Sequence, residues 1–203
     1  MRTKIIITLA GLLLAGCATE TVNIDVVNDE GKAVMALDYR DFAQAASEMI
    51  QSMIGSGALK KPGGGRYVMT TARVTNDTMQ RIDTDQLTAK IEEELMNSGM
   101  VVMTSAVGGK GAPDEMIYEM RDIRDSATGD EFKQETLAGK KTLIAPELSV
   151  SGKILQRNIR YDNNRQQVEY YFQLRVTDLT TGLRFWQKES IIGKRGSNKS
   201  VAW

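Results

Sequence analysis

The sequence predicts an α+β fold: a mixed β-sheet that ends in an antiparallel meander, with helices packed on it. Two patterns predict it. Apolar residues recur at helical spacing in three segments between residues 38 and 124, whereas the last third alternates apolar and polar residues in three long stretches separated by turn sequences. Helices followed by hairpins are typical of an α+β domain. The chain of 203 residues is long enough for one well-buried domain.

The N-terminal segment predicts a signal peptide over residues 1–16. Arg2 and Lys4 give a positive start, residues 5–14 are apolar apart from Thr8, and small residues precede Cys17. About ten apolar residues cannot span a bilayer core of about 30 Å, which needs roughly 20 residues. We therefore expect the segment to be removed and not to remain as a transmembrane helix.

Cys17 is the only cysteine and ends the run Leu14-Ala15-Gly16-Cys17, which resembles the bacterial lipobox. In that motif the thiol receives a diacylglycerol, the signal is cut off and the new amino terminus is acylated. A lone exported cysteine has no disulfide partner, which favours lipidation over an ordinary signal. Two or three acyl chains hold a protein stably on a membrane. Because Ala18 follows instead of an aspartate, the resemblance implies sorting to the periplasmic face of the outer membrane.

Composition argues against several functions. Without residues 1–16 the chain keeps 24 of its 26 basic residues against 26 acidic ones, so we expect no nucleic-acid partner. The absence of histidine excludes Ser-His-Asp and Cys-His catalysis and histidine metal ligands. Acidic residues cluster at expected helix starts or on polar helix faces, which we favour over a carboxylate pair or a calcium site. We expect no enzyme, no metal, no small-molecule substrate, and no cofactor beyond the lipid on Cys17.

Residues 17–37 are weakly patterned and are expected to form the lipidated cysteine and a short tether, with at most a short strand at 22–27. The globular domain is expected over 38–203. Its first helix begins after Asp38, a good N-cap, and ends at Gly55-Ser56-Gly57. The stripe expected in the core consists of Phe42, Ala45, Ala46, Met49, Ile50 and Met53. The loop Pro62-Gly63-Gly64-Gly65 then leads into a strand.

This strand is expected over 67–74, with a turn at Thr75-Asn76-Asp77. A second helix starts at Asp83 or Thr84 and stops at 97–99. Its expected core residues are Leu87, Ile91 and Leu95.

Residues 100–103 predict a short, fully apolar strand in an inner position of the sheet. A third helix is expected from Asp114 to about Arg124. Its expected inward residues are Met116, Ile117, Met120 and Ile123. Residues 126–141 are ambiguous and can hold a short helix around 131–137.

The last third predicts a β-meander with strands at 148–161, 166–179 and 183–192. The middle strand alternates strictly, so one face is expected to pack on helices and the other to be available. Its expected core residues are Val168, Tyr170, Phe172, Leu174 and Val176.

The expected hairpin register nominates a binding surface. If 179–182 form a four-residue loop, Arg175 lies opposite Trp186 and Thr177 opposite Arg184, while Leu183 and Phe185 point to the core. Trp186 then shares the available face with Arg184, Arg175 and Tyr171, a composition typical of a binding hot spot. The alternative is that another segment covers this face, with Arg175 stacked on the indole. A register slip of one residue would invert the assignment.

Several stretches together carry a family resemblance. They are Arg73-Val74-Thr75-Asn76-Asp77-Thr78, Asp83-Thr84-Asp85-Gln86-Leu87, Leu148-Ser149-Val150-Ser151-Gly152-Lys153-Ile154 and Tyr170-Tyr171-Phe172-Gln173-Leu174, with Thr180, Gly182, Leu183 and Trp186. They resemble the LpoB family, outer-membrane lipoproteins that activate class A penicillin-binding proteins, over nearly all of 37–203.

The resemblance implies a compact domain related to the TolB amino-terminal and curli-secretion lipoprotein folds. It also implies that the activity is binding: the domain docks on a regulatory domain of a bifunctional synthase and stimulates glycan polymerisation and peptide crosslinking. The implied contact residues are Arg184 and Trp186, with Tyr171 as the nearby tyrosine.

The short tether departs from the long, proline-rich linker of the best-known members. Twenty extended residues reach at most about 70 Å, and a domain of this size adds about 30 to 40 Å. The alternative function is therefore a structural subunit of an outer-membrane assembly, such as a secretion channel or an appendage-associated ring. An enzyme acting on cell-wall glycan would need two positioned carboxylates, and the sequence nominates none.

Overall fold

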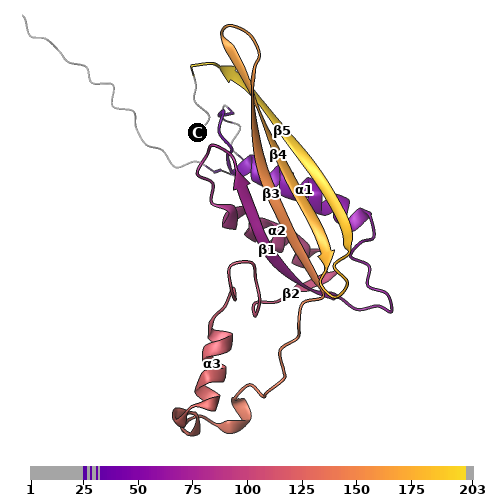
Figure 1. Cartoon of the computed structure of the whole chain (residues 1–203), viewed down its shortest axis with the longest axis vertical. Coiled ribbons are helices and arrows are strands. Elements are labelled where there is room, and N and C mark those ends of the chain that lie inside the picture. The colour runs from indigo at the N-terminus through magenta and orange to yellow at the C-terminus, as the bar shows by residue number, and fades with distance from the viewer. Residues whose placement is uncertain (1–24, 27, 29–30, 32, 200–203) are drawn as a thin grey trace, which may run out of the picture. The chain divides into compact units, whose positions relative to one another are not determined.

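The computed structural model describes residues 25, 26, 28, 31 and 33–199 (Figure 1). The predicted signal peptide and Cys17 lie outside the described residues, as does most of the possible strand at 22–27. The chain divides into two units, Met1–Glu30 and Gly31–Trp203. Every helix and strand of the described residues lies in the second unit. Within the described part of the chain, no helix combines the length and the apolar character needed to cross a membrane.

The second unit contains a five-stranded mixed sheet with the strand order β2-β1-β3-β4-β5. The strands are β1 (Tyr67–Asp77), β2 (Val101–Met103), β3 (Leu148–Arg160), β4 (Arg165–Asp178) and β5 (Arg184–Ser197). β1 runs parallel to both of its neighbours, whereas β3, β4 and β5 form the predicted antiparallel meander. This sheet and its helices confirm the predicted α+β fold.

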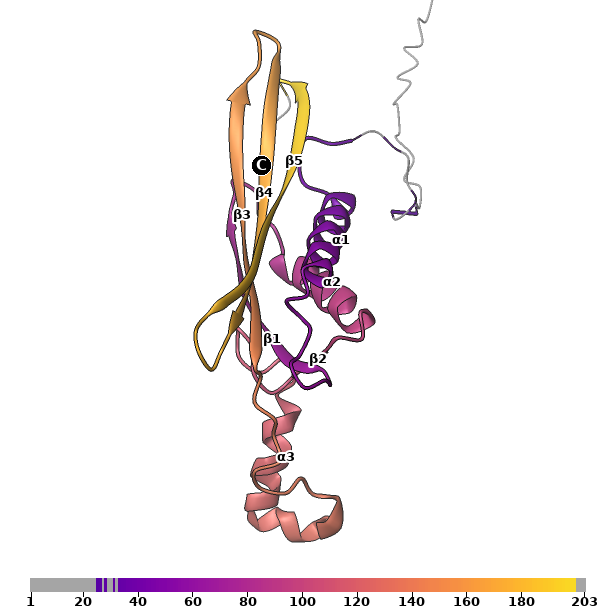
Figure 2. The same cartoon turned by 90° about the vertical axis from the view of Figure 1, so that its right-hand side faces the viewer.

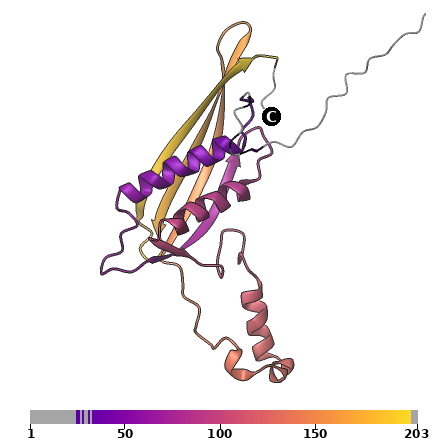
Figure 3. The same ribbon diagram turned by 180° about the vertical axis from the view of Figure 1, so that it is seen from behind.

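Two helices, α1 (Tyr39–Gly55) and α2 (Thr84–Asn97), lie side by side on one face of the sheet (Figures 2 and 3). Both begin where the sequence predicts. The Asp38 carboxylate accepts hydrogen bonds from two backbone N–H groups of the first turn of α1, and Asp41 completes a capping box. Asp83 caps α2 by accepting from the N–H of Asp85.

The core lies between these helices and the sheet. All the core residues predicted for the first helix, the second helix and the middle strand are buried. Phe42 of α1 meets Phe172 of β4 edge to face, with 5.9 Å between the ring centroids. The helical stripe and the period-two strand therefore meet as the sequence predicts.

The predicted turn at Thr75-Asn76-Asp77 is wrong. These three residues extend β1 and pair with residues 153–155 of β3. The turn follows instead, where the Asn76 side chain accepts from the Thr78 N–H at 3.1 Å and donates to the Gln80 carbonyl at 2.8 Å. Asparagine therefore supports the turn from the end of the strand. β5 likewise continues past its predicted end at residue 192, to Ser197.

The predicted inner position of the short apolar strand is also wrong, because β2 is an edge strand that pairs only with β1. Val101 is buried all the same, since β2 lies against α2. The residues of β2 are apolar because α2 packs against this strand, and not because the strand has a neighbour on each side.

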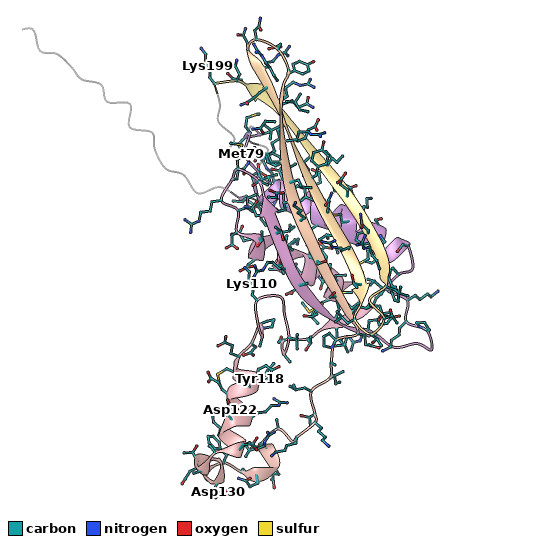
Figure 4. All side chains as sticks on the ribbon, in the orientation of Figure 1. Met79, Lys110, Tyr118, Asp122, Asp130 and Lys199 are labelled. Carbon is teal, nitrogen blue, oxygen red and sulfur yellow. The ribbon has the colours of Figure 1, made fainter. Side chains whose placement is uncertain are left out.

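The third helix, α3 (Met116–Asp125), does not pack on the sheet, and none of its residues is buried. It belongs to the excursion, residues 104–147, which extends from the end of the sheet at β2 and carries Tyr118, Asp122 and Asp130 (Figure 4). The excursion also holds two 3-10 helices, η1 (Ala127–Glu131) and η2 (Gln134–Thr136), so the ambiguous segment is partly helical.

The predicted inward stripe of this third helix is therefore wrong. Met116 is 52% exposed, whereas Ile117, Met120 and Ile123 are half-buried. The helix is tied to the returning chain, since Arg124 Nη1 donates to the carbonyl of Ala138 at 2.7 Å. The half-buried residues of α3 are therefore covered by other parts of the excursion and not by the core of the domain.

Candidate partner-binding surface

The face of the sheet turned toward the viewer in Figure 1 carries none of the described helices. We call it the open face. Its residues alternate along β3, β4 and β5 with the core residues, because successive side chains of a strand point to opposite faces. From the pairing, its central members are Ser151, Lys153, Leu155, Arg157, Glu169, Tyr171, Gln173, Arg175, Arg184, Gln187, Glu189 and Ile191.

A β-bulge changes the predicted register of β4 and β5. Thr177 pairs with Arg184 as predicted, but the next pair is Val176 with Trp186, so Phe185 is an extra residue on β5. Every β5 residue from Trp186 onward therefore points to the face opposite to the predicted one.

The predicted exposure of Trp186 is consequently wrong. Trp186 is only 8% exposed and belongs to the hydrophobic core, opposite the fully buried Val176. Leu183 and Phe185, which were expected in the core, are 61% and 41% exposed. Because of the one additional residue in the strand, Trp186 lies in the core and Phe185 lies at the surface.

The other three predicted contact residues lie on the open face. Arg175 pairs with Gln187 instead of Trp186, and its Nε donates to Ser151 Oγ at 3.0 Å. Arg184 Nη1 donates to Gln187 Oε1 at 2.6 Å, so the two arginines flank the same glutamine. Tyr171 lies further along β4. The structure thus brings Arg175 and Arg184 together and leaves Trp186 on the opposite side of the sheet.

The Tyr171 end of the open face is a connected polar network. The Tyr171 hydroxyl donates to the Glu169 carboxylate, which raises the pKa of Tyr171 and lowers the pKa of Glu169. Gln167 Nε2 donates to the other Glu169 oxygen at 2.7 Å, and Arg195 Nη2 donates to Gln167 Oε1 at 2.7 Å. These bonds fix the orientation of the side chains on the open face.

An apolar row crosses the sheet beside this network. Tyr171 pairs with Leu155 on β3 and with Ile191 on β5, so the three side chains are neighbours on one face. Ile191 is 56% exposed, and the other two are half-buried. An apolar centre with a polar rim is the usual organisation of a protein interface. Sequence reasoning missed Ile191, because the register without the bulge places it in the core.

Apart from the open face, a hollow of about 270 Å³ lies between β1, α2 and the loop 108–113. Lys110 and Asp85 in its wall form an ion pair of 2.5 Å, and Thr71 donates to Glu92. Gly109 makes this packing possible, since a Cβ there would lie 2.3 Å from the backbone nitrogen of Arg73. These polar groups bond to one another. Among the described residues, no group of three or more Asp, Glu, His or Cys side chains is placed to hold a metal ion.

Comparisons with known proteins identify the family. The family model "Peptidoglycan-synthase activator LpoB" matches residues 41–192. No curated protein matches the sequence. Among solved structures, the LpoB C-terminal domains of Salmonella enterica and Escherichia coli are 12% and 13% identical, with TM-scores of 0.42 and 0.43. Each alignment covers 75% of this chain and 98% of that domain.

Lipoprotein GNA1162 from Neisseria meningitidis is 10% identical with a TM-score of 0.34, over 66% of this chain and 86% of that one. The family assignment rests on the sequence model and not on these structural similarities. That model covers well over half of the 203 residues and agrees with the resemblance carried by the sequence motifs. The chain belongs to the LpoB family of peptidoglycan-synthase activators.

Proposed function

We propose that this chain is an outer-membrane lipoprotein that binds and activates a class A, bifunctional penicillin-binding protein and so regulates peptidoglycan synthesis. The family match over residues 41–192 carries the proposal. In it, the lipid on Cys17 anchors the chain to the periplasmic face of the outer membrane. The domain acts by binding, without catalysis of its own and without a cofactor.

The open face supports a binding role. A partner that covers Leu155, Tyr171 and Ile191 removes apolar surface from water, which is worth about 25 cal/mol per Å². The row sits on three paired strands, so little backbone order has to be gained on binding. Arg175 and Arg184 stand at one end and favour a partner with acidic side chains at that place.

Trp186 has a different role in this proposal from the one expected from sequence. Its indole packs behind the sheet with Val176 and so supports the bulge that displays Phe185 and Arg184. We therefore propose Tyr171, Arg175 and Arg184 as contact residues, joined by Leu155 and Ile191. Trp186 holds the surface in shape.

The test is an activation assay. The full chain in detergent is added to a class A synthase from the same organism, and glycan-chain synthesis from lipid-linked precursor is followed. We expect the rate to rise and a complex to form at micromolar concentrations. The proposal would be overturned if the rate did not change and no complex formed. Ring-shaped particles of the extracted protein would instead favour the structural subunit of an outer-membrane assembly.

A further inference from the structure

The chain enters the domain through three consecutive residues, 35–37, that are held by side chains from distant parts of the sequence. The Tyr170 hydroxyl donates to the Met35 carbonyl at 2.9 Å, and Lys194 Nζ donates to the Ala36 carbonyl at 2.7 Å. The Leu37 N–H donates to Gln80 Oε1 at 3.1 Å. An irregular segment outside any helix or strand thus has its backbone bonded to β4, to β5 and to the loop after β1.

The three side chains that hold this segment are themselves buried. Tyr170 is 0%, Gln80 6% and Lys194 8% exposed. Gln80 Nε2 also donates to the Tyr170 oxygen, so these two side chains fix each other. If the entering segment moved away, each of the three would lose a partner while buried, which is unfavourable.

Lys194 also connects the segment to the start of α1. Its Nζ lies 2.5 Å from an Asp41 oxygen and 3.9 Å from Asp38, the N-cap. Burial acts to raise the pKa of Asp38, but the hydrogen bond from Arg40 and the nearby positive charges lower it overall. Lys194 of β5 therefore bonds both to the backbone of the entering segment and to the acidic side chains at the start of α1.

Gly196, two residues after Lys194 on the same side of β5, completes the arrangement. A Cβ at this position would lie 2.5 Å from the sulfur of Met35, so the Met35 side chain packs directly against this glycine and would have to shift for a larger residue. The end of β5, which pairs with β4 as far as Ser197, thus also lies against the entering segment.

We propose that Gln80, Tyr170, Lys194 and Gly196 form an intramolecular clamp that fixes residues 35–37, so that the chain is held to the domain beside β5 from Met35 onward. Only the role of the tether, which is to connect the domain to its lipid anchor, rests on the proposed function. The clamp takes three residues from the 20 of the tether expected at 18–37, which shortens its greatest reach by about 10 Å.

Hydrogen exchange followed by mass spectrometry tests the clamp on the full chain in detergent. In the unaltered protein we expect the amide of Leu37 to be protected. Gln80→Leu removes its acceptor, and Tyr170→Phe removes only the hydroxyl that holds Met35. Both are expected to speed exchange of residues 33–38 at least tenfold and to leave residues 45–53 of α1 unchanged. Gln173→Leu, a matched substitution on the open face, should change neither segment.

Two results would overturn the clamp: exchange of residues 33–38 at the rate of an unstructured peptide in the unaltered protein, or unchanged exchange in both variants. If Gln80→Leu speeds exchange throughout the domain, that variant has destabilised the whole fold. The test then depends on Tyr170→Phe, because the phenylalanine ring still fills the core. The synthase assay separates this inference from the proposed function. Loss of the clamp does not touch the open face, so activation by the detergent-solubilised chain should persist.

Discussion

The two faces of β4 show how one strand separates stability from recognition. On the helix-covered face its five core residues are between 0% and 2% exposed. On the open face the residues between them are half-buried or exposed and are bonded to neighbouring side chains. Substitutions on the first face should therefore cost folding stability, whereas those on the second should affect binding.

The largest difference is expected between two neighbours on this strand. Phe172→Ala removes a ring that contacts Phe42 and should lower the free energy of unfolding by about 3–5 kcal/mol. Gln173→Ala, one residue on, should change it by less than about 0.5 kcal/mol. Urea denaturation of both variants gives the comparison, and equal losses would break it.

Trp186 gives a sharper test of the difference between the two faces, because it lies in the core only as a result of the bulge at Phe185. Trp186→Ala should lower the free energy of unfolding by about 3 kcal/mol or more. Arg184→Ala, on the other side of the bulge, should lower it by less than about 0.5 kcal/mol. A stable Trp186→Ala variant that no longer bound the synthase would show that the predicted register was right after all.

Alkaline pH separates the two neighbouring tyrosines. Burial raises the pKa of Tyr170 to about 12, from the ordinary 10.0, so the folded state keeps a proton that the unfolded state loses. This contribution is complete below pH 10 and is lost as the pH rises toward 12. Tyr170→Phe should flatten the fall of the urea midpoint between pH 10 and 12 more than Tyr171→Phe, which removes the hydroxyl of a half-buried side chain on the open face. The reverse order would contradict the assignment of the two faces.

The smallest effect is expected from Glu169 on the open face. The hydrogen bond from Tyr171 lowers the pKa of Glu169 from 4.5, so the folded state gives up this proton more readily than the unfolded state. Its contribution is present above pH 4.5 and is lost as the pH falls through the lowered value. Glu169→Gln should make acid unfolding only slightly less steep, because solvent screens such a pair. A large change would mean that the open face contributes to folding stability.

Local periodicity was sufficient to predict α1, α2 and the core side of β4, because each pattern spans several turns or strand pairs. The same reasoning could not show what covers an apolar stripe. In α3 three of the four expected residues are half-buried and Met116 is exposed, because the returning chain of the excursion covers the helix in part and the helix does not pack on the sheet. The extension of β1 through Asp77 likewise depends on β3, which lies far along the sequence.

The candidate surface was predicted in part. Tyr171 and Arg175 follow from alternation within β4, and Arg184 follows from the turn. Trp186 and Ile191 do not, because no residue near Phe185 signals an inserted position, and one insertion reverses the rest of β5. The clamp residues Gln80 and Lys194 carry no local sign of burial either, since their partners arise only from tertiary packing.

The affinity of the full chain for the proposed partner, a class A synthase, compared between two matched variants, tests the central claim most directly. Ile191→Asp places a charge in the apolar row, whereas Ile144→Asp makes the same change in the excursion, at a residue that is 70% exposed. We expect Ile191→Asp to raise Kd at least 30-fold, the equivalent of about 2 kcal/mol, and Ile144→Asp to leave it unchanged. Equal affinity of the two variants would contradict the assignment of the open face as the binding surface.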